Sequence, residues 1–155
     1  MGLDMYLMRK RALNTGEWVK PEFRDEITIK RGGKEVDTRR VRYVEEEVGY
    51  WRKANAIHRW FVENVQKGED DCKTYPVTLT QLITLRDLCQ EVLNSKAVEL
   101  AEATMPTKSG FFFGNTEYDD YYFDDLKSTI KIVDWILEED NMEGTYSTYT
   151  YQSSW

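Results

Sequence analysis

The chain has 155 residues, of which 41% are hydrophobic and 14% aromatic, and its formal net charge is −7. This length suits a single globular domain over residues 1–155, and this hydrophobic content excludes an intrinsically disordered chain. No apolar run approaches the roughly 18 residues of a transmembrane helix, and the amino terminus lacks the basic start of a signal peptide. We therefore expect a cytoplasmic protein without membrane contact, in which Cys72 and Cys89 are free thiols.

Charge is distributed unevenly along the chain. Residues 1–60 carry 14 Lys or Arg and 10 Asp or Glu, a net of +4, whereas residues 61–155 carry 7 and 18, a net of −11. An acidic protein is a poor general binder of nucleic acid, because contacts to phosphates need clustered cations. The basic first third can still attract a small anionic ligand, and the acidic remainder can meet a basic protein surface.

The first third of the chain is predicted to contain strands and then a helix. Apolar residues alternate in "LDMYLM", residues 3–8, which predicts a strand. Gly32 and Gly33 predict a two-residue hairpin turn, and its return strand is expected over residues 36–44. A helix is expected over residues 49–67. Its apolar face would consist of Trp51, Ala54, His58, Phe61, Val62 and Val65.

The middle of the chain is predicted to be helical after a loop over residues 68–76. Thr78 and Gln81 have the spacing of a capping box, in which each side chain bonds the backbone N–H of the other. The helix that follows carries apolar residues at core spacing over residues 82–92. A second, short helix is expected over residues 95–103.

The last third is predicted to return to strands around one long helix. Residues 111–113 are expected to form a short apolar strand, followed by a turn at residues 114–115. A helix should start near Asp119 or Asp120, and a final strand is expected over residues 144–152. The buried face of the helix would consist of Tyr122, Leu126, Ile130, Val133, Ile136 and Leu137.

This succession predicts an α+β fold in one domain. We expect a small antiparallel sheet, built from the amino-terminal strand, the Gly-Gly hairpin and the carboxyl-terminal strand, packed with about three helices. Asp4 is unusual as an acid in an apolar first strand. Its role is left open between a bond to the chain terminus, a bond to a neighbouring arginine, and a position in a ligand pocket.

The single histidine, His58, has two interpretations. It is either a neutral core residue with a hydrogen-bond partner, because a charged imidazole is costly on an apolar face, or it points into a pocket beside Trp51. Asn55, one helical turn earlier, favours a pocket of apolar walls with a few orienting polar groups. Arg52 and Arg59 are then candidates to hold an anion, or they are solvated surface cations.

The segment "FFFGNTEYDDYY", residues 111–122, is a second candidate site. Asp119 or Asp120 can serve as the N-cap of the following helix, but this role does not explain Glu117. The aromatic side chains suit stacking on planar rings such as nucleobases, and equally a core or a partner surface. Those aromatic residues include Phe113, Tyr118 and Tyr122.

Three blocks of this sequence together resemble a family of small proteins from tailed bacteriophages and prophages. The blocks are "MGLDMYL", "VGYWRKANAIHRWFVENV" and "GFFFGNTEYDDYYFDDL". The resemblance implies an accessory protein made in the cytoplasm of a host bacterium, and it implies no particular reaction. Such accessory proteins often oppose host defence by sequestering or degrading signal nucleotides, or by blocking a defence protein. That expectation rests on the biological setting of such proteins and not on particular residues of this chain.

Our favoured interpretation is a binding protein for a small, nucleotide-like anionic ligand. Arg52 or Arg59 would pair with phosphate, and tyrosines would stack on the base. No Walker loop or dinucleotide fingerprint occurs, and we expect no cofactor and no metal. The predicted ligand-binding residues are Trp51, Arg52, Asn55, His58, Arg59, Phe113, Glu117, Tyr118, Asp119 and Tyr122.

Two alternatives belong to other classes of protein. One is a hydrolase or phosphodiesterase that uses His58 and the acids from Glu117 to Asp120. The other is an acidic inhibitor of a host defence protein or a nucleic-acid-binding protein, with tyrosines as interface anchors. A host protein partner and a homo-oligomeric state are both left open.

Overall fold

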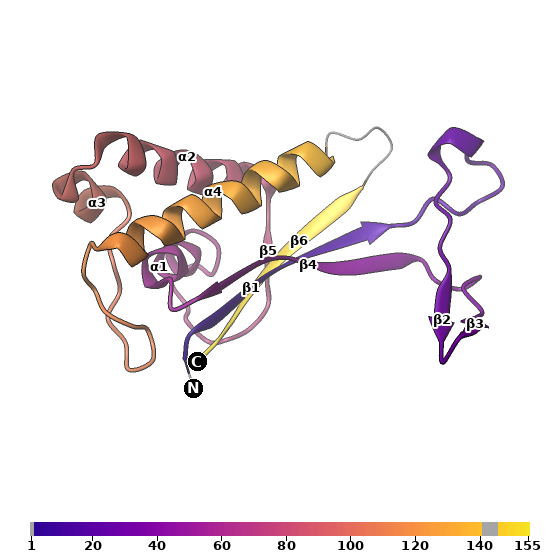
Figure 1. Ribbon diagram of the computed structural model, residues 1–155, viewed down its shortest axis with the longest axis horizontal. Coiled ribbons are helices and arrows are strands. Elements are labelled where there is room, and N and C mark those ends of the chain that lie inside the picture. Colours follow the sequence, from indigo (N-terminus) through magenta and orange to yellow (C-terminus); the bar gives the residue numbers. More distant parts are fainter. Residues whose placement is uncertain (1, 141–145) are drawn as a thin grey trace.

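A four-stranded antiparallel sheet with strand order β4-β1-β6-β5 organises the protein. The computed structural model describes residues 2–140 and 146–155. Within them the chain forms a single α+β domain, as the sequence predicts (Figure 1). The strands of this sheet are β1 (Asp4–Ala12), β4 (Tyr43–Arg52), β5 (Tyr75–Val77) and β6 (Ser147–Ser154).

One face of the sheet is buried and carries most of the core residues of the strands. Met5 and Leu7 of β1 are fully buried, whereas Tyr6 between them is half-exposed on the opposite face. Met5 lies opposite Trp51 of β4, and Leu7 lies opposite Tyr151 of β6. Because successive side chains of a strand point to opposite faces, this alternation directs one row of large apolar groups toward the helices.

Four helices in the described residues lie over that buried face, some in contact with the sheet and others packed on neighbouring helices (Figure 1). They are α1 (Asn55–Asn64), α2 (Leu79–Ser95), α3 (Val98–Thr104) and α4 (Asp120–Asp140). Phe61 of α1 stacks on Tyr151 with ring centroids 3.9 Å apart and planes 6° apart. The Trp51 indole donates a hydrogen bond of 2.9 Å to Thr129 Oγ1 of α4. These contacts join both strand neighbours of β1 to helices. None of the helices in the described residues is long and apolar enough to cross a membrane.

Residues 13–42 form an arm that extends beyond the end of the sheet (Figure 1). It contains a short 3-10 helix and a two-stranded hairpin, and its two ends meet where Ala12 pairs with Tyr43. Every residue from 13 to 42 is half-buried or exposed, so the arm has no core of its own. The elements of the arm are η1 (Pro21–Phe23), β2 (Ile29–Arg31) and β3 (Lys34–Val36).

Several predicted local signals are confirmed. Gly32 and Gly33 have φ angles of 57° and 81° and connect β2 to β3, although this hairpin forms a separate sheet rather than joining the main one. Asp119 Oδ1 accepts a hydrogen bond from Tyr122 N at the start of α4, as expected of an N-cap. The final strand is confirmed as β6, and residues 144 and 145 of the predicted range lie outside the described residues.

The predicted helix over residues 49–67 is wrong at its beginning. Residues 49–52 belong to β4, and α1 begins only at Asn55. Lys53 has a φ angle of 58°, in the left-handed region, and this conformation separates strand from helix. Trp51 therefore lies on a strand and not on a helix face.

Three further predictions also fail. The return strand of the hairpin ends at Val36 rather than continuing to residue 44. Residues 111–113 form a turn rather than a strand, because the Phe112 carbonyl bonds the backbone of Leu3 and Phe113 N bonds Gly110 O. The predicted loop over residues 68–76 includes the first residues of β5, which pairs with β6.

The capping box at the start of α2 provides a test of the fold. Thr78 Oγ1 accepts from Gln81 N at 3.1 Å, and Gln81 Oε1 accepts from Thr78 N at 2.9 Å. We expect Thr78→Ala to lower the free energy of unfolding by about 1 kcal/mol, because the backbone N–H of Gln81 loses its partner. Chemical denaturation measures the change. Thr80→Ala, also at an exposed position, should change it by less than about 0.5 kcal/mol, and an equal loss for both would contradict the cap.

Candidate functional site

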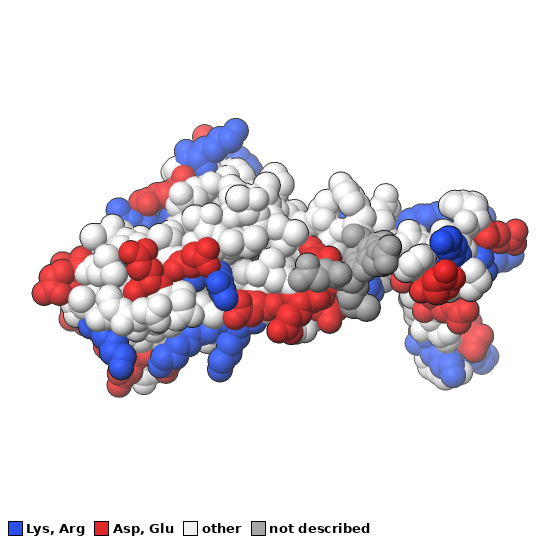
Figure 2. Space-filling view, turned by 90° about the horizontal axis from the view of Figure 1, so that it is seen from above, with Lys and Arg blue, Asp and Glu red and all other residues white. Residues whose placement is uncertain are grey.

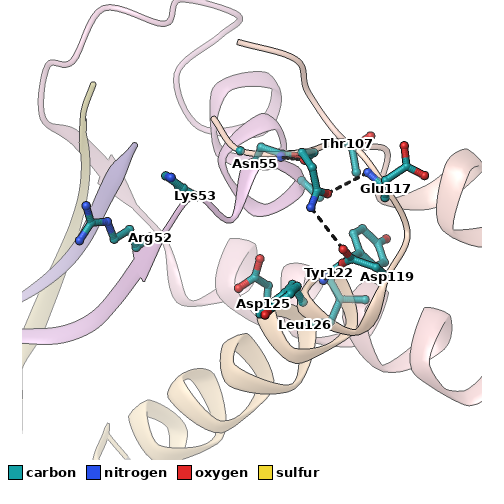
Figure 3. A pocket seen from close by; sticks show the side chains of 13 residues that line it. Arg52, Lys53, Asn55, Thr107, Glu117, Asp119, Tyr122, Asp125 and Leu126 are labelled. Atoms are coloured by element: carbon teal, nitrogen blue, oxygen red, sulfur yellow. Dashed lines mark hydrogen bonds between the residues drawn. The ribbon is translucent and has the colours of Figure 1, made fainter. Parts of the chain in front are cut away.

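A pocket of about 250 Å³ lies between the end of β4, the start of α1 and the first turns of α4 (Figure 3). The segment from Thr107 to Asp119 covers it and supplies part of the wall. Its volume is at the small end of ligand sites in proteins. The lining residues are Arg52, Lys53, Asn55, Ala56, Thr107, Gly114, Asn115, Glu117, Asp119, Tyr121, Tyr122, Asp125 and Leu126.

The buried side chain of Asn55 fixes the covering segment to the start of α1. Its Nδ2 donates to the carbonyl oxygens of Phe113, at 3.1 Å, and of Asn115, at 2.7 Å. Its Oδ1 accepts from Lys108 N at 3.1 Å. An amide can make these bonds in both directions, whereas an aspartate or a leucine at this position could not. The loop is therefore held to the helix by three bonds to one side chain.

Lys53 and Gly114 approach each other closely at one side of the pocket. Gly114 has a φ angle of 87°, and a Cβ built there would lie 3.3 Å from Lys53 Cβ. Both residues thus adopt left-handed backbone conformations, which for Lys53 is uncommon outside turns. Backbone strain of this kind is found preferentially at functional sites.

Two cations lie on one side of the pocket and the acidic side chains lie on the other (Figure 3). Arg52 has only a 3.8 Å contact to Asp4, which also accepts a hydrogen bond from the Tyr50 hydroxyl. Lys53 forms no ion pair with any residue that the structure describes. Both charges are therefore available to an anion that enters the pocket.

The acidic wall contains one carboxyl group with an unusual pKa. Burial, together with the nearby charges of Asp124 and Asp119, raises the pKa of Asp125 to about 7. Asp119 is already engaged, because it caps α4 and accepts from Asn115 Nδ2 at 3.2 Å. The Asp125 and Glu117 carboxyl groups accept no hydrogen bond from a described residue. A strongly perturbed carboxyl in a cleft is a candidate functional group.

His58 does not line this pocket but lies in the core at the centre of a hydrogen-bonded chain. It is fully buried. Its Nδ1 is 2.8 Å from the Tyr151 hydroxyl, and its Nε2 is 3.0 Å from Asp70 Oδ2. An ionised carboxylate only accepts, so Nε2 carries the proton and Nδ1 accepts from the Tyr151 O–H. Both ring nitrogens are therefore satisfied in the neutral form.

Asp70 carries the negative charge in this hydrogen-bonded chain of side chains. Burial raises the pKa of Asp70, but hydrogen bonds from Lys108 and His58 outweigh it, and the net shift is downward. Lys108 Nζ donates to Oδ2 at 2.8 Å, and the Trp155 indole donates to Oδ1 at 3.1 Å. Burial lowers the pKa of His58 despite the carboxylate. The hydrogen-bonded chain therefore consists of neutral His58 next to an ion pair between Lys108 and Asp70.

The structure brings five of the ten predicted ligand-binding residues to the pocket. These are Arg52, Asn55, Glu117, Asp119 and Tyr122. The other five lie elsewhere. Trp51 and Phe113 are core residues, and Phe113 meets the edge of the His58 ring at 5.1 Å. Tyr118 packs on Tyr122, and Arg59 pairs with Glu63 at 2.7 Å.

The sequence prediction missed Lys53, Asp125 and Tyr121 in the pocket, and Asp70 and Tyr151 around His58. Lys53 follows Arg52 directly, and its left-handed conformation has no sequence signature. Asp125 lies in the second turn of α4, and its sequence position matches an ordinary acid near the start of a helix. Its pKa shift depends on the covering segment, which only the tertiary structure reveals.

Among residues 2–140 and 146–155, no group of three or more His, Cys, Asp or Glu side chains is arranged to hold a metal ion. Comparison of the chain with protein-family models, with curated proteins and with solved structures gives no match. The site is therefore interpreted from its own geometry.

The burial of His58 predicts a structural effect of its removal. We expect His58→Ala to lower the free energy of unfolding by about 2 to 4 kcal/mol, because it leaves a cavity and removes the hydrogen-bond partner of the buried Tyr151 hydroxyl. Because the His58 pKa lies below its ordinary 6.5 in the folded state, wild-type stability should also fall as pH drops below about 6.5. Denaturant titrations measure both. Arg59→Ala, on the exposed side of α1, should cost less than about 1 kcal/mol; an unchanged stability of His58→Ala would contradict the core role.

Asp125 predicts the opposite pH dependence. Its folded pKa of about 7 exceeds the ordinary 3.8, so only the unfolded chain loses this proton between about pH 4 and pH 7, and stability is lost as pH rises through that window. Asp125→Asn should therefore be more stable than wild type by about 1 to 2 kcal/mol at pH 8, after discounting for solvent screening, and equally stable near pH 4. Asp120→Asn, exposed in the preceding turn of α4, should show no such pH-dependent gain. A gain for Asp125→Asn that is independent of pH would disprove the shift.

Proposed function

We propose that the pocket binds a small nucleotide-like ligand. Its phosphate would pair with Arg52 and Lys53, and hydroxyl or amino groups of its sugar or base would donate to the acidic wall. The observation that supports this assignment is the pairing across one small pocket of two available cations with carboxyl groups that lack donors. A ligand with an anionic end and a hydrogen-bond-donating end complements both walls, whereas a purely anionic ligand would be repelled by Glu117 and Asp125.

The chemistry of each wall matches a different part of such a ligand. Lys and Arg are the side chains that bind phosphate most often. Carboxylates only accept hydrogen bonds, so they suit ribose hydroxyls and exocyclic amino groups. Tyr121 lines the pocket with 79% of its surface exposed, and an exposed tyrosine offers a face on which a base can stack.

The biological setting that we propose follows from the resemblance of the three sequence blocks to phage and prophage proteins. In a host bacterium, a protein of this kind would act by sequestering a nucleotide that signals infection. Sequestration requires binding and no chemistry, and a preorganised pocket held by Asn55 suits it, because little ordering would accompany binding.

A hydrolase that acts on the same ligand is the second candidate, and Asp125 favours it. A pKa of about 7 places this carboxyl group where a general acid or base works best near neutral pH. His58 cannot serve in this way from its buried position, with both ring nitrogens occupied. This candidate therefore relies on Asp125 rather than on the histidine.

Thermal unfolding with a panel of mononucleotides, cyclic di- and trinucleotides and ADP-ribose derivatives tests the proposal. A ligand at about 100 times its dissociation constant should add about 2.7 kcal/mol to stability, a rise of roughly 5 to 11 °C in Tm for a domain of this size. Lys53→Ala should abolish most of this rise, because it removes one of the two phosphate contacts.

Lys96→Ala is the matched control for Lys53→Ala. Lys96 also has a left-handed backbone, with φ of 53° against 58° for Lys53, but it lies at the end of α2 and not at the pocket. It should keep the full Tm rise. A panel without any shift, or an equal loss in both variants, would overturn the proposal. Chromatography of the ligand after incubation distinguishes the binding protein from the hydrolase, because only a hydrolase converts the ligand to a product. If a product forms, Asp125→Asn should stop its formation.

A further inference from the structure

The arm of residues 13–42 lacks the interactions that normally stabilise such a segment. None of its residues is buried, and an isolated two-stranded hairpin is marginally stable in water. Trp18 is 90% exposed and Ile29 is 45% exposed. Within the described residues, the two strands of the hairpin, residues 29–36, pair only with each other and not with the main sheet. An extension of this kind is explained if it packs against another molecule.

One face of the hairpin combines apolar and basic side chains. Ile29 pairs with Val36, and Arg31 pairs with Lys34, so these four residues share a face. Like charges directly opposite each other destabilise a strand pair, and neither Arg31 nor Lys34 forms an ion pair with a described residue. An acidic surface against this face would relieve the repulsion.

The rest of the chain carries the complementary charge. Residues 13–42 have eight Lys or Arg and six Asp or Glu, a net of +2, whereas the remaining residues have 13 and 22, a net of −9. The arm is therefore a basic extension of an acidic body. This asymmetry makes a second copy of the same chain a partner of suitable charge.

An acidic ridge lies on the body near the base of the arm. It consists of Glu46 of the edge strand β4, which pairs with Arg9 on the helix side of the sheet, and of Glu138 and Glu139 near the end of α4. Acidic side chains gather toward this end of α4 in Figure 2. The two parts are joined by buried Arg9, whose Nη2 lies 2.9 Å from Glu46 and 3.9 Å from Glu139.

The ridge also has an aromatic anchor. Trp135 packs over Arg9, with the guanidinium carbon 5.0 Å from the ring centroid, and 42% of its surface is exposed. Arg9 contributes one positive charge to the ridge, and the glutamates of the ridge carry more negative charges than this. A surface that joins a partly exposed tryptophan to excess carboxylates complements the Ile29–Val36 and Arg31–Lys34 face.

We propose that two copies of the chain form a two-fold dimer by exchanging arms, with the hairpin of each copy on the acidic ridge of the other. The arm projects away from its own body beyond the sheet (Figure 1), so it is placed to meet a neighbour. A two-fold arrangement forms the contact twice, because each copy offers both an arm and a ridge.

Sedimentation velocity from 1 to 100 µM protein tests the exchange with two charge-reversal variants. The arm variant carries Arg31→Glu and Lys34→Glu, and the ridge variant carries Glu138→Lys and Glu139→Lys. We expect wild type to dimerise, more weakly at 0.5 M salt than at 0.05 M salt, and each variant alone to be monomeric. An equimolar mixture of the two should dimerise, because every arm then meets a ridge of opposite charge.

A control variant with Lys96→Glu and Lys127→Glu reverses two cations outside the arm, and it should dimerise like wild type. Circular dichroism should show all four proteins folded, because none of the reversed residues is buried. Three results would overturn the exchange: a wild type that is monomeric throughout, an arm variant that still dimerises, or a mixture of the two variants that stays monomeric. The first would mean that the arm meets a different molecule.

Discussion

The amide of Asn55 is the interaction on which the pocket depends. One buried side chain makes three hydrogen bonds to the backbone of the segment that covers the pocket. Its position at the first turn of α1 places it two residues after Lys53, whose left-handed conformation turns the chain from strand to helix. Strand end, helix start and covering segment therefore meet at one point. Arg52 and Lys53 reach the pocket from the end of the strand, and Glu117 and Asp119 of the acidic wall belong to the covering segment.

A second polar constraint lies in the core behind the pocket. Tyr151, His58 and Asp70 connect the central region of the sheet to α1 and to the segment before β5, and Lys108 and Trp155 complete the set of partners. A buried polar chain stabilises only when every member is satisfied. This chain therefore favours one arrangement of its elements over others. The aromatic rings of Phe113 and Tyr151 pack around His58 and favour the same arrangement.

Sequence reasoning succeeded where a local rule decides the structure. The capping box of Thr78 and Gln81, the Gly32–Gly33 turn and the Asp119 cap involve residues within a few positions of one another. It failed at residues 49–52, because the apolar positions Trp51 and Ala54 fit a helix while the alternation of Gly49 and Trp51 fits a strand. Five of the thirteen residues that line the pocket were predicted, from residues 52–55 and 117–122. Asp125 was not, since its pKa depends on burial beneath a segment that no spacing rule brings there.

The pairing of Ala12 with Tyr43 makes the whole arm the connection of a β-hairpin formed by β1 and β4. In a hairpin, the entropy lost on closing the loop grows only with the logarithm of its length, so thirty residues in place of two cost about 2.4 kcal/mol. The hydrogen bonds between β1 and β4 do not depend on which residues the loop contains. The body can thus keep its fold while the arm is lengthened, shortened or exchanged.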